Sequence, residues 1–324
     1  MLNRRDFVAA CGALPLLSAG ARAQAMPDTA KLVVGFTAGG LSDMMARRLA
    51  DKLRGSYAGT VVVENKPGAS GQIAIAQVKD SPGDGSVLLF THSSAMAMYP
   101  FTFAKLAYDP VKDFLPVSLV CHTNHAICVG PAVPASVANL KDFLAWARAN
   151  PGKANTGTPG LGSMPHMIVS VVSKQSGVEL KPIAYRGTAA SITDVLAGQV
   201  ASAVGPVGNF LPQLGAGKLR LMAISGAERS SFAPNVPTFR EQGIAMTARE
   251  WYGVYLPGKA SADVQRRAST LVQAALTEPS LIAGLQQSGV DVAHSTPQVL
   301  AGMLEADTQE WKRLTREIGF TAES

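Results

Sequence analysis

The sequence predicts an α/β protein with two lobes, each formed by a mostly parallel sheet flanked by helices. Three observations lead to this fold class. Short apolar runs that end at glycines alternate with segments of helical periodicity, which is the pattern of parallel sheets covered by helices. The 324 residues are enough for roughly two domains of ordinary size. Hydrophobic residues make up 47% and charged residues only 16%, a composition that favours a packed core over disorder or a coiled coil.

The first half of the chain predicts strand, helix, strand, helix and strand. Residues 31–36 are apolar, contain β-branched side chains and end at glycines, which indicates a buried strand. Residues 42–53 place Met45, Ala46, Leu49 and Leu53 at helical spacing. The same reasoning predicts strands at 61–63 and 87–90 and a helix at 72–79, with a loop at 67–71 and a turn at 82–85.

In the second half, apolar runs and segments of helical periodicity alternate again. The sequence of this half is not a repeat of the first half. A long, mostly apolar segment runs from 117 to 129, and the chain closes with a helix at 299–318. Between them we expect helices at 140–149, 164–175 and 191–196 and strands at 180–185, 200–204, 219–225 and 251–256. Two α/β lobes are therefore the natural interpretation.

The N-terminus has the features of an export signal. Arg4 and Arg5 precede an apolar stretch from Phe7 to Leu17, and small residues follow up to Ala25. The run from Arg4 to Phe7 also resembles the twin-arginine motif. The alternative is a disordered tail that happens to contain two arginines. We therefore predict that residues 1–25 form a signal peptide, of the twin-arginine type, whose removal leaves the mature protein in the periplasm.

The sequence patterns of common catalytic and metal sites are missing. No serine has glycine at both −2 and +2, and neither H-E-x-x-H nor a complete P-loop occurs. Cys121, His122, His125 and Cys128 are not at a familiar zinc spacing, and in a strand they would divide between two faces. The two cysteines either pair or are buried in the strand. We expect no catalytic residue, no metal and no cofactor.

The charge distribution argues against nucleic acid as a partner. The formal net charge of +6 is modest for this length, and no more than two basic residues are adjacent.

Two glycine-rich loops are the candidate binding elements. Each loop, at residues 36–43 and 155–163, precedes an expected helix. At the start of a helix, unpaired backbone N–H groups carry partial positive charge. Glycine lets an anion approach such a backbone closely, so both loops are suited to a carboxylate. The alternative for the first loop is a simple tight turn capped by Ser42. Arg186, in a third polar loop, either pairs with a carboxylate or is a solvated surface charge.

Nine short blocks, in order, make the chain resemble the substrate-binding proteins of tripartite tricarboxylate transporters, also called the Bordetella uptake gene family. The resemblance runs from about Leu32 to Ile318. The blocks are Gly39-Gly40-Leu-Ser-Asp43 with Ala46-Arg47, Val62-Val63-Glu64-Asn65-Lys66-Pro67-Gly68-Ala69, Pro82-Gly83-Asp84-Gly85, Tyr108-Asp109-Pro110-Val-Lys-Asp113-Phe114, Gly160-Leu-Gly162-Ser163-Met-Pro-His166, Tyr185-Arg-Gly187, Gly198-Gln199-Val200, Pro237-Thr238 and Trp251-Tyr252-Gly253.

The resemblance implies a periplasmic solute-binding protein with a clamshell fold of the type II class. Lobe 1 would then be discontinuous, comprising residues 26–125 and 251–324, and lobe 2 would comprise residues 126–250. Two strands would cross between the lobes near Ala126 and Trp251. The family holds carboxylates largely through backbone amides and ordered water. An acidic residue that the family often carries after Gly198-Gln199-Val200 is replaced here by Ala201 and Gly205, which disfavours an amino-acid ligand.

The resulting expectation is a non-enzymatic, monomeric protein that binds a small organic carboxylate and delivers it to membrane transporter subunits. The alternatives are an exported enzyme that acts on a carboxylate in the same cleft and an orphan binding protein that serves a sensor. The residues expected to bind the ligand are Phe36, Ala38, Gly39, Gly40, Ser42, Asp43, Ser93, Ser94, Gly160, Ser163, His166, Tyr185, Arg186, Thr188 and Gly205.

Overall fold

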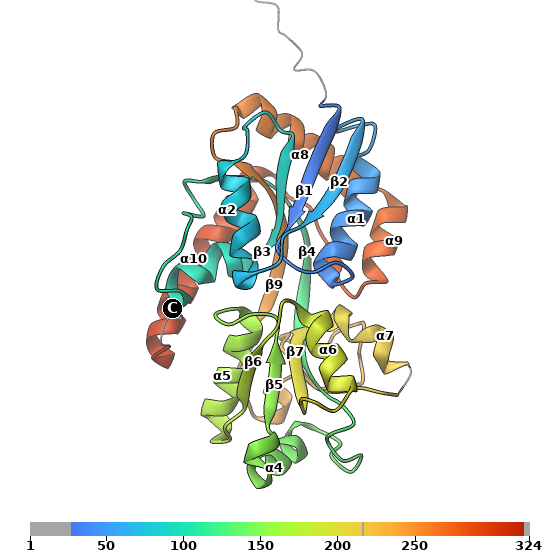
Figure 1. Ribbon diagram of the computed structural model, residues 1–324, viewed down its shortest axis with the longest axis vertical. Coiled ribbons are helices and arrows are strands. Elements are labelled where there is room, and N and C mark those ends of the chain that lie inside the picture. Colours follow the sequence, from blue (N-terminus) through green and yellow to red (C-terminus); the bar gives the residue numbers. More distant parts are fainter. Residues whose placement is uncertain (1–26, 216, 321–324) are drawn as a thin grey trace, which may run out of the picture.

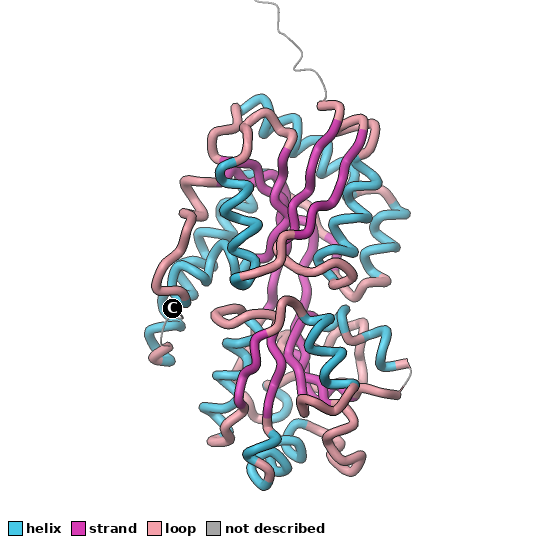
Figure 2. Tube along the Cα trace, in the orientation of Figure 1, coloured by secondary structure: helices cyan, strands magenta, loops and turns pink. Residues whose placement is uncertain are grey.

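A computed structural model describes residues 27–215 and 217–320. The predicted signal peptide, residues 1–25, lies outside the described residues. The described chain forms two lobes, one above the other in Figure 1, with a separate set of parallel strands in each. Strands run through the middle of both lobes and helices cover their outer faces (Figure 2).

The upper lobe contains the N-terminal strands and the C-terminal helices. Its parallel strands are β2 (Thr60–Asn65), β1 (Thr29–Val34) and β3 (Val87–His92), in that spatial order. The helices of this lobe are α1 (Leu41–Leu53), α2 (Gln72–Asp80), α3 (Tyr99–Thr102), α8 (Ala262–Leu276), α9 (Pro279–Gln286) and α10 (Pro297–Ile318). A short strand, β10 (Asp291–Val292), also belongs to this sheet.

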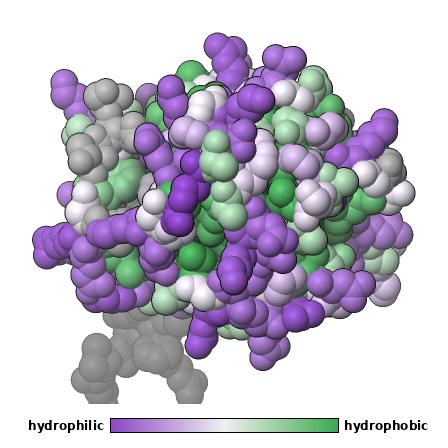
Figure 3. All heavy atoms as spheres, turned by 90° about the horizontal axis from the view of Figure 1, so that it is seen from below, coloured by the Kyte–Doolittle hydropathy of each residue, from purple (hydrophilic) through white to green (hydrophobic). Residues whose placement is uncertain are grey.

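The lower lobe is formed by the middle of the chain. Its parallel strands are β6 (Lys181–Ala184), β5 (Asn155–Thr158) and β7 (Ser202–Pro206). Its other elements are α4 (Leu140–Ala149), α5 (Met164–Ser176), α6 (Thr188–Leu196), α7 (Leu211–Leu214) and strand β8 (Arg220–Ile224). Figure 3 views the molecule from below and shows hydrophilic side chains spread among apolar ones over this end.

Two long antiparallel strands connect the lobes. β4 (Phe114–Val129) pairs with β9 (Arg249–Pro257) from Phe114 to Asn124, which places this part of β4 in the upper sheet. From His125 onward β4 pairs with β7 and β8 of the lower sheet. The chain therefore passes from one sheet to the other without a loop. The predicted two-lobed α/β clamshell is confirmed. The antiparallel pairs are those of β4 with β9, of β9 with β3, and of β4 with β7 and β8.

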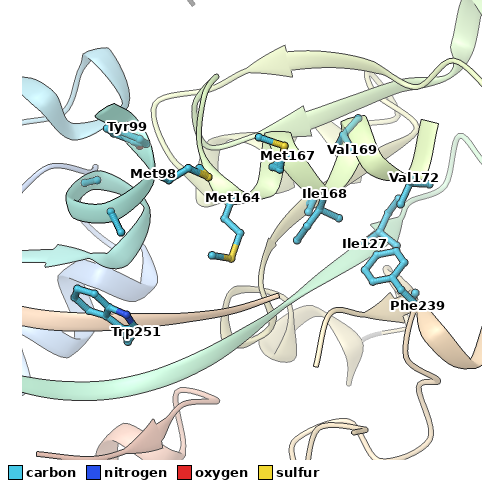
Figure 4. Packing of buried hydrophobic residues seen from close by; sticks show 14 of the residues in the cluster. Met98, Tyr99, Ile127, Met164, Met167, Ile168, Val169, Val172, Phe239 and Trp251 are labelled. Atoms are coloured by element: carbon cyan, nitrogen blue, oxygen red, sulfur yellow. The ribbon is translucent and has the colours of Figure 1, made fainter. Parts of the chain in front are cut away.

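Apolar packing continues from one lobe into the other. The largest cluster of buried apolar side chains contains residues of both lobes, including Met98 and Trp251 above and Met167 below. Figure 4 shows Met164, at the start of α5, next to Met98, and Trp251 belongs to the same cluster. Two further clusters lie within single lobes, one around α1 and α8 and one behind β8. Apolar packing within the largest cluster therefore joins the two lobes.

The structure differs from the sequence prediction at β5. Residues 155–158 were expected to be loop, and they form a strand that pairs with β6 and β7. Asn and Gly disfavour a strand and alternate here with two Thr residues, so the local signal of this four-residue run is weak and tertiary packing decides. A Cβ on Gly157 would lie 2.7 Å from the Cβ of Ser191, so glycine is required for α6 to pack this closely on β5. Another unpredicted element is the buried π-helical turn Ser94–Met98, which leads into α3.

Both cysteines of β4 are free and buried. Cys121 packs in the upper lobe and Cys128 in the lower lobe. Seven residues of extended strand separate them by about 23 Å, which is far beyond the reach of a disulfide. Burial raises the pKa of the Cys128 thiol to about 12. The interpretation of these residues as buried strand residues is therefore confirmed. Within residues 27–215 and 217–320, no helix combines the length and apolar character that a membrane span needs.

Candidate functional site

A narrow cavity of about 40 Å³ lies between the lobes, beside the crossing strands. Elements from both lobes contribute to it: the β1–α1 loop, the end of β3, the centres of β4 and β9, and the starts of α5 and α6. The lining residues are Phe36, Thr37, Gly40, Leu41, Ser42, His92, Ser94, His125, Pro159, Ser163, Pro165, Gly187, Thr188, Pro206, Asn209, Glu250 and Tyr252. We call this space the inner cavity.

Three helix N-termini contribute to the wall of the inner cavity. α1 contributes residues 40–42, α5 contributes Ser163 and Pro165, and α6 contributes Gly187 and Thr188. The last residue of β7, Pro206, also lines it. Ligands of α/β proteins bind at this end of a sheet because strands end and helices begin there. The partial positive charge of the helix N-termini makes the inner cavity favourable for an anion.

Two side chains hold the glycine-rich loops in shape. The backbone N–H of Gly39 donates to Oδ2 of Asp43 over 2.9 Å, and Arg47 pairs with the same carboxylate. Burial raises the pKa of Asp43, but hydrogen bonds from Arg47 and Gly39 outweigh burial and lower it overall. In the other lobe, the N–H of Gly162 donates to Nδ1 of His166 over 3.0 Å. Asp43 and His166 therefore fix the loops instead of lining the inner cavity.

Hydrogen bonds cross between the lobes at the edge of the inner cavity. The N–H of Leu41 donates to Oδ1 of Asn209 over 3.1 Å, and the N–H of Met164 donates to Oγ of Ser94 over 3.3 Å. Two side-chain hydroxyls of the upper lobe, those of Ser70 and Thr102, donate to carbonyl oxygens of the α5 loop over 3.0 and 2.9 Å. The lobes are thus in a closed arrangement, in which the N-termini of α1 and α5 each donate to a side chain of the opposite lobe.

The floor of the inner cavity carries a buried acid between two histidines. Oε1 of Glu250 lies 3.1 Å from Nδ1 of His92, and Oε2 lies 3.0 Å from Nε2 of His125. Oε1 also accepts hydrogen bonds from the N–H and the hydroxyl of Ser94. Burial alone would raise the pKa of Glu250, but the adjacent histidines outweigh burial and hold it well below its usual range. We call these three residues the His–Glu–His cluster.

A second, wider cavity of about 500 Å³ lies beside the inner one. It is lined by Phe36 and Pro159, which it shares with the inner cavity, and by Gly35, Pro67, Gly68, Ala69, Ser70, Gly71, Ile73, Phe103, Gly160, Leu161, Ala184, Tyr185 and Arg186. We call it the outer cavity. Its volume lies within the range of small-molecule sites.

The structure places the predicted site residues in three groups. The inner cavity is lined by Phe36, Gly40, Ser42, Ser94, Ser163 and Thr188. The outer cavity is lined by Phe36, Gly160, Tyr185 and Arg186. The remaining predicted residues line neither cavity: Ala38, Gly39, Asp43, Ser93, His166 and Gly205. Gly205 adjoins the site, because a Cβ there would lie 2.5 Å from Cγ2 of Thr188.

Sequence reasoning did not include the His–Glu–His cluster or Asn209 among the ligand-binding residues. His92 stood beside the predicted Ser93 and Ser94, and His125 was considered only as a metal ligand. The available signal for Glu250 was an ionisable residue at the start of an apolar strand, directly before Trp251. Among the described residues, no group of three or more His, Cys, Asp or Glu side chains could hold a metal ion.

Two α/β lobes joined by two crossing strands, with a cavity between them, are the features of the periplasmic binding protein fold. The chain matches the family described as "Tripartite tricarboxylate transporter family receptor" over residues 45–320, and it belongs to that family.

Relatives and solved structures agree with this family. The chain is 30% identical to a Pseudomonas sp. (strain P51) protein described as "UPF0065 protein in tcbD-tcbE intergenic region", over 90% of this chain and 86% of that protein. It superposes on the periplasmic binding protein BugD with a TM-score of 0.86 and 28% identity, covering 91% of this chain and 99% of BugD. A Rhodopseudomonas palustris protein with adipate gives a TM-score of 0.85 and 28% identity, covering 91% and 98%.

Proposed function

We propose that this protein is a periplasmic solute-binding protein that captures a small organic carboxylate between its lobes and delivers it to the membrane subunits of a tripartite tricarboxylate-type transporter. The observation that carries the proposal is the convergence of the N-termini of α1, α5 and α6 on one cavity at the crossing strands. The similarity to a protein solved with adipate supports a carboxylate as the ligand.

We propose that one carboxylate of the ligand enters the inner cavity and that the rest of the ligand lies in the outer cavity. A space of about 40 Å³ has room for about three water-sized groups, which matches a single carboxylate. Backbone amides of the two glycine-rich loops supply hydrogen bonds to it. The N–H of Leu41, at the start of α1, donates to Oδ1 of Asn209. A carboxylate oxygen of the ligand can replace this Oδ1 as the acceptor of that hydrogen bond.

We propose that ligand capture is a hinge closure about β4 and β9, with lobe 1 at residues 26–125 and 251–324 and lobe 2 at 126–250. The crossing between sheets at Asn124 and His125 supports this division. Hinge motions need only a few residues at the ends of elements. The protein would act as a monomer and without catalysis, since binding and release complete its task.

The test is a titration of the mature chain, residues 26–324, with succinate, glutarate and adipate and with the neutral diamide of each acid. We expect at least one diacid to bind and its diamide to fail, because the helix N-termini favour negative charge. A ligand at 100 times its dissociation constant raises the free energy of unfolding by about 2.7 kcal/mol, which a thermal shift detects. Equal binding of diacids and diamides, or turnover of any diacid, would contradict the proposal.

We expect replacement of Arg186 by Ala to weaken diacid binding by less than about fivefold. Arg186 lines the outer cavity and is exposed, and an exposed ion pair contributes less than about 1 kcal/mol. Calorimetric titration of the variant measures the loss. Complete loss of binding would mean that a side-chain salt bridge, and not the loop amides, holds the ligand.

We expect replacement of both Arg4 and Arg5 by Lys to leave the precursor in the cytoplasm, because the twin-arginine route requires the arginine pair. Cell fractionation followed by detection of the processed chain measures this. A normal periplasmic yield from the double variant would assign the signal peptide to the general secretory route.

A further inference from the structure

The His–Glu–His cluster is built from three strands that meet at the hinge. His92 ends β3, His125 lies in β4 where that strand changes sheets, and Glu250 lies near the start of β9. Their exposed fractions are 4%, 0% and 3%, and all three line the inner cavity. Buried ionisable groups at this position are costly unless they have a partner. We therefore expect the cluster to have a function that apolar side chains at the floor of the cavity could not perform.

The hydrogen bond between His92 and Glu250 determines which nitrogen of the His92 ring carries a proton. Because Oε1 accepts from Nδ1 of His92, that nitrogen bears a hydrogen and the neutral ring has a lone pair on Nε2. Nε2 of His125 lies 3.0 Å from Oε2 of Glu250 but makes no hydrogen bond with it. Among the described residues, Nε2 of His92 and both ring nitrogens of His125 are therefore buried without a hydrogen-bond partner.

These unpartnered ring nitrogens determine what the floor of the cavity can bind. A lone pair on Nε2 repels a carboxylate oxygen, whereas a protonated ring presents an N–H donor to it. Glu250 cannot itself take a cationic ligand group without losing partners, since Oε1 accepts from Ser94 as well as from His92. An added carboxylate beside ionised Glu250 would be strongly repelled unless a histidine carries positive charge.

We propose that His92, with His125 beside it, is the charge-recognising element for the ligand carboxylate, and that the carboxylate binds together with one proton held by the His–Glu–His cluster. This inference rests on the proposed function, because it assigns the residues and the protonation state that receive the carboxylate. Glu250 acts as a positioning residue: it orients the ring of His92 through a hydrogen bond, lies beside the ring of His125 and remains ionised.

The two tyrosines beside His92 and the polar side chains of the lower lobe do not carry charge near neutral pH. The rings of Tyr99, from α3, and Tyr252, from β9, lie 6.0 and 5.9 Å from the ring of His92. Burial raises the pKa of both phenols, so they remain neutral. The lower lobe contributes only the uncharged Ser163, Thr188 and Asn209 as polar side chains.

Two further groups on neighbouring elements complete the surroundings. Phe36, in the β1–α1 loop, packs against His92 with 5.2 Å between ring centroids and does not titrate. Asp43, on α1, is ionisable, but it is already paired with Arg47 and with the N–H of Gly39. Among the described residues that line the inner cavity, the two histidines are therefore the side chains that can carry a positive charge.

The experiment is calorimetric titration of residues 26–324 with adipate, and with succinate and glutarate in parallel, at pH values between 6 and 8. Each titration is run in two buffers of different ionisation enthalpy, so that the proton uptake is measured on the unmodified protein. We expect uptake approaching one proton per bound diacid near the upper end of this range. We also expect the affinity to rise by up to about tenfold for each unit of pH decrease.

Two variants separate recognition from a structural role. His92→Gln keeps a neutral donor and should bind the diacid without proton uptake and with a flat pH profile. His122→Gln is the matched control, because His122 lies on β4 but does not line the inner cavity, and its pH profile should follow that of the unmodified protein.

The outcomes are distinguishable. If no diacid binds at any pH, the proposed function falls and this inference falls with it. If a diacid binds with no proton uptake, or if His92→Gln keeps the full pH profile, the proposed function stands and the inference is wrong.

Discussion

The Gly160→Val variant is expected to fold normally and to bind its diacid at least about a hundredfold more weakly. A Cβ on Gly160 would lie 2.4 Å from Oγ and 2.9 Å from Cβ of Ser70, on the opposite lobe. The clash exists only when the lobes are closed, so it raises the free energy of the bound state and leaves each lobe intact. A loss of about 2.7 kcal/mol in binding free energy corresponds to a hundredfold in affinity.

Ser70 has little freedom to move away from this clash. Its backbone is left-handed, with φ 55° and ψ 31°, a conformation that a residue with a side chain rarely adopts. Its carbonyl oxygen accepts from the hydroxyl of Tyr99, and its own hydroxyl donates to the carbonyl of Leu161. Strain of this kind persists where the surroundings hold the backbone in place.

Two further variants test the explanation. A Cβ on Gly152, in the same lobe as Gly160, would meet no atom within 4 Å, and Gly152 lines neither cavity, so Gly152→Val should bind the diacid normally. Gly160→Ala adds the Cβ alone and should also weaken binding, because that atom already meets Ser70. Ser70→Gly removes Oγ and Cβ of Ser70 and suits a left-handed backbone, so the double variant of Gly160→Ala with Ser70→Gly should regain much of this loss. Calorimetric titration compares these variants. Normal affinity of Gly160→Val would show that binding does not require this contact between the lobes.

Much of the fold was predictable because most elements carry their own amphipathic pattern. The expected boundaries of α4 agree with the structure, since Asn139 caps the helix with its side chain and Asn150 follows its last residue. Strands β1, β3 and β9 were found from their apolar runs. β5 was missed because its buried Thr and Gly residues acquire strand geometry only from β6, β7 and the helix packed above them.

The candidate site was predictable where it is local in sequence. Glycine-rich loops before helices can be recognised within about ten residues, and six of the predicted residues line the inner cavity. The His–Glu–His cluster has no such signal. His92 and Glu250 are 158 positions apart, and only the antiparallel pairing of β3 with β9 brings them together. The partner of the Leu41 amide, Asn209, is 168 positions away.

Replacement of Glu250 by Ala is expected to reduce the free energy of unfolding by about 3–5 kcal/mol, as removal of one partner from a buried charged group does. Glu250 is 3% exposed and holds His92, His125 and Ser94 together at the junction of three strands. Without the carboxylate, the His92 ring and the Ser94 N–H lose their acceptor in a buried place, and His125 loses the charge that lies 3.0 Å from its Nε2. Urea unfolding of the ligand-free variant at neutral pH measures the loss.

The pH dependence and a matched control make the assignment of this loss to the buried charge testable. Because the pKa of Glu250 is lowered in the folded protein, its stabilisation is present above the ordinary carboxyl value of 4.5 and is lost as the pH falls through the lowered value. The difference in stability between the unmodified protein and Glu250→Ala should therefore shrink in acid. Glu310→Ala is the control, since Glu310 and its partner Arg313 are each 52% exposed and their pair contributes less than about 1 kcal/mol. Equal and small losses for Glu250→Ala and Glu310→Ala would mean that the buried carboxylate contributes no more to stability than a surface charge, and that the cluster does not hold the three strands together.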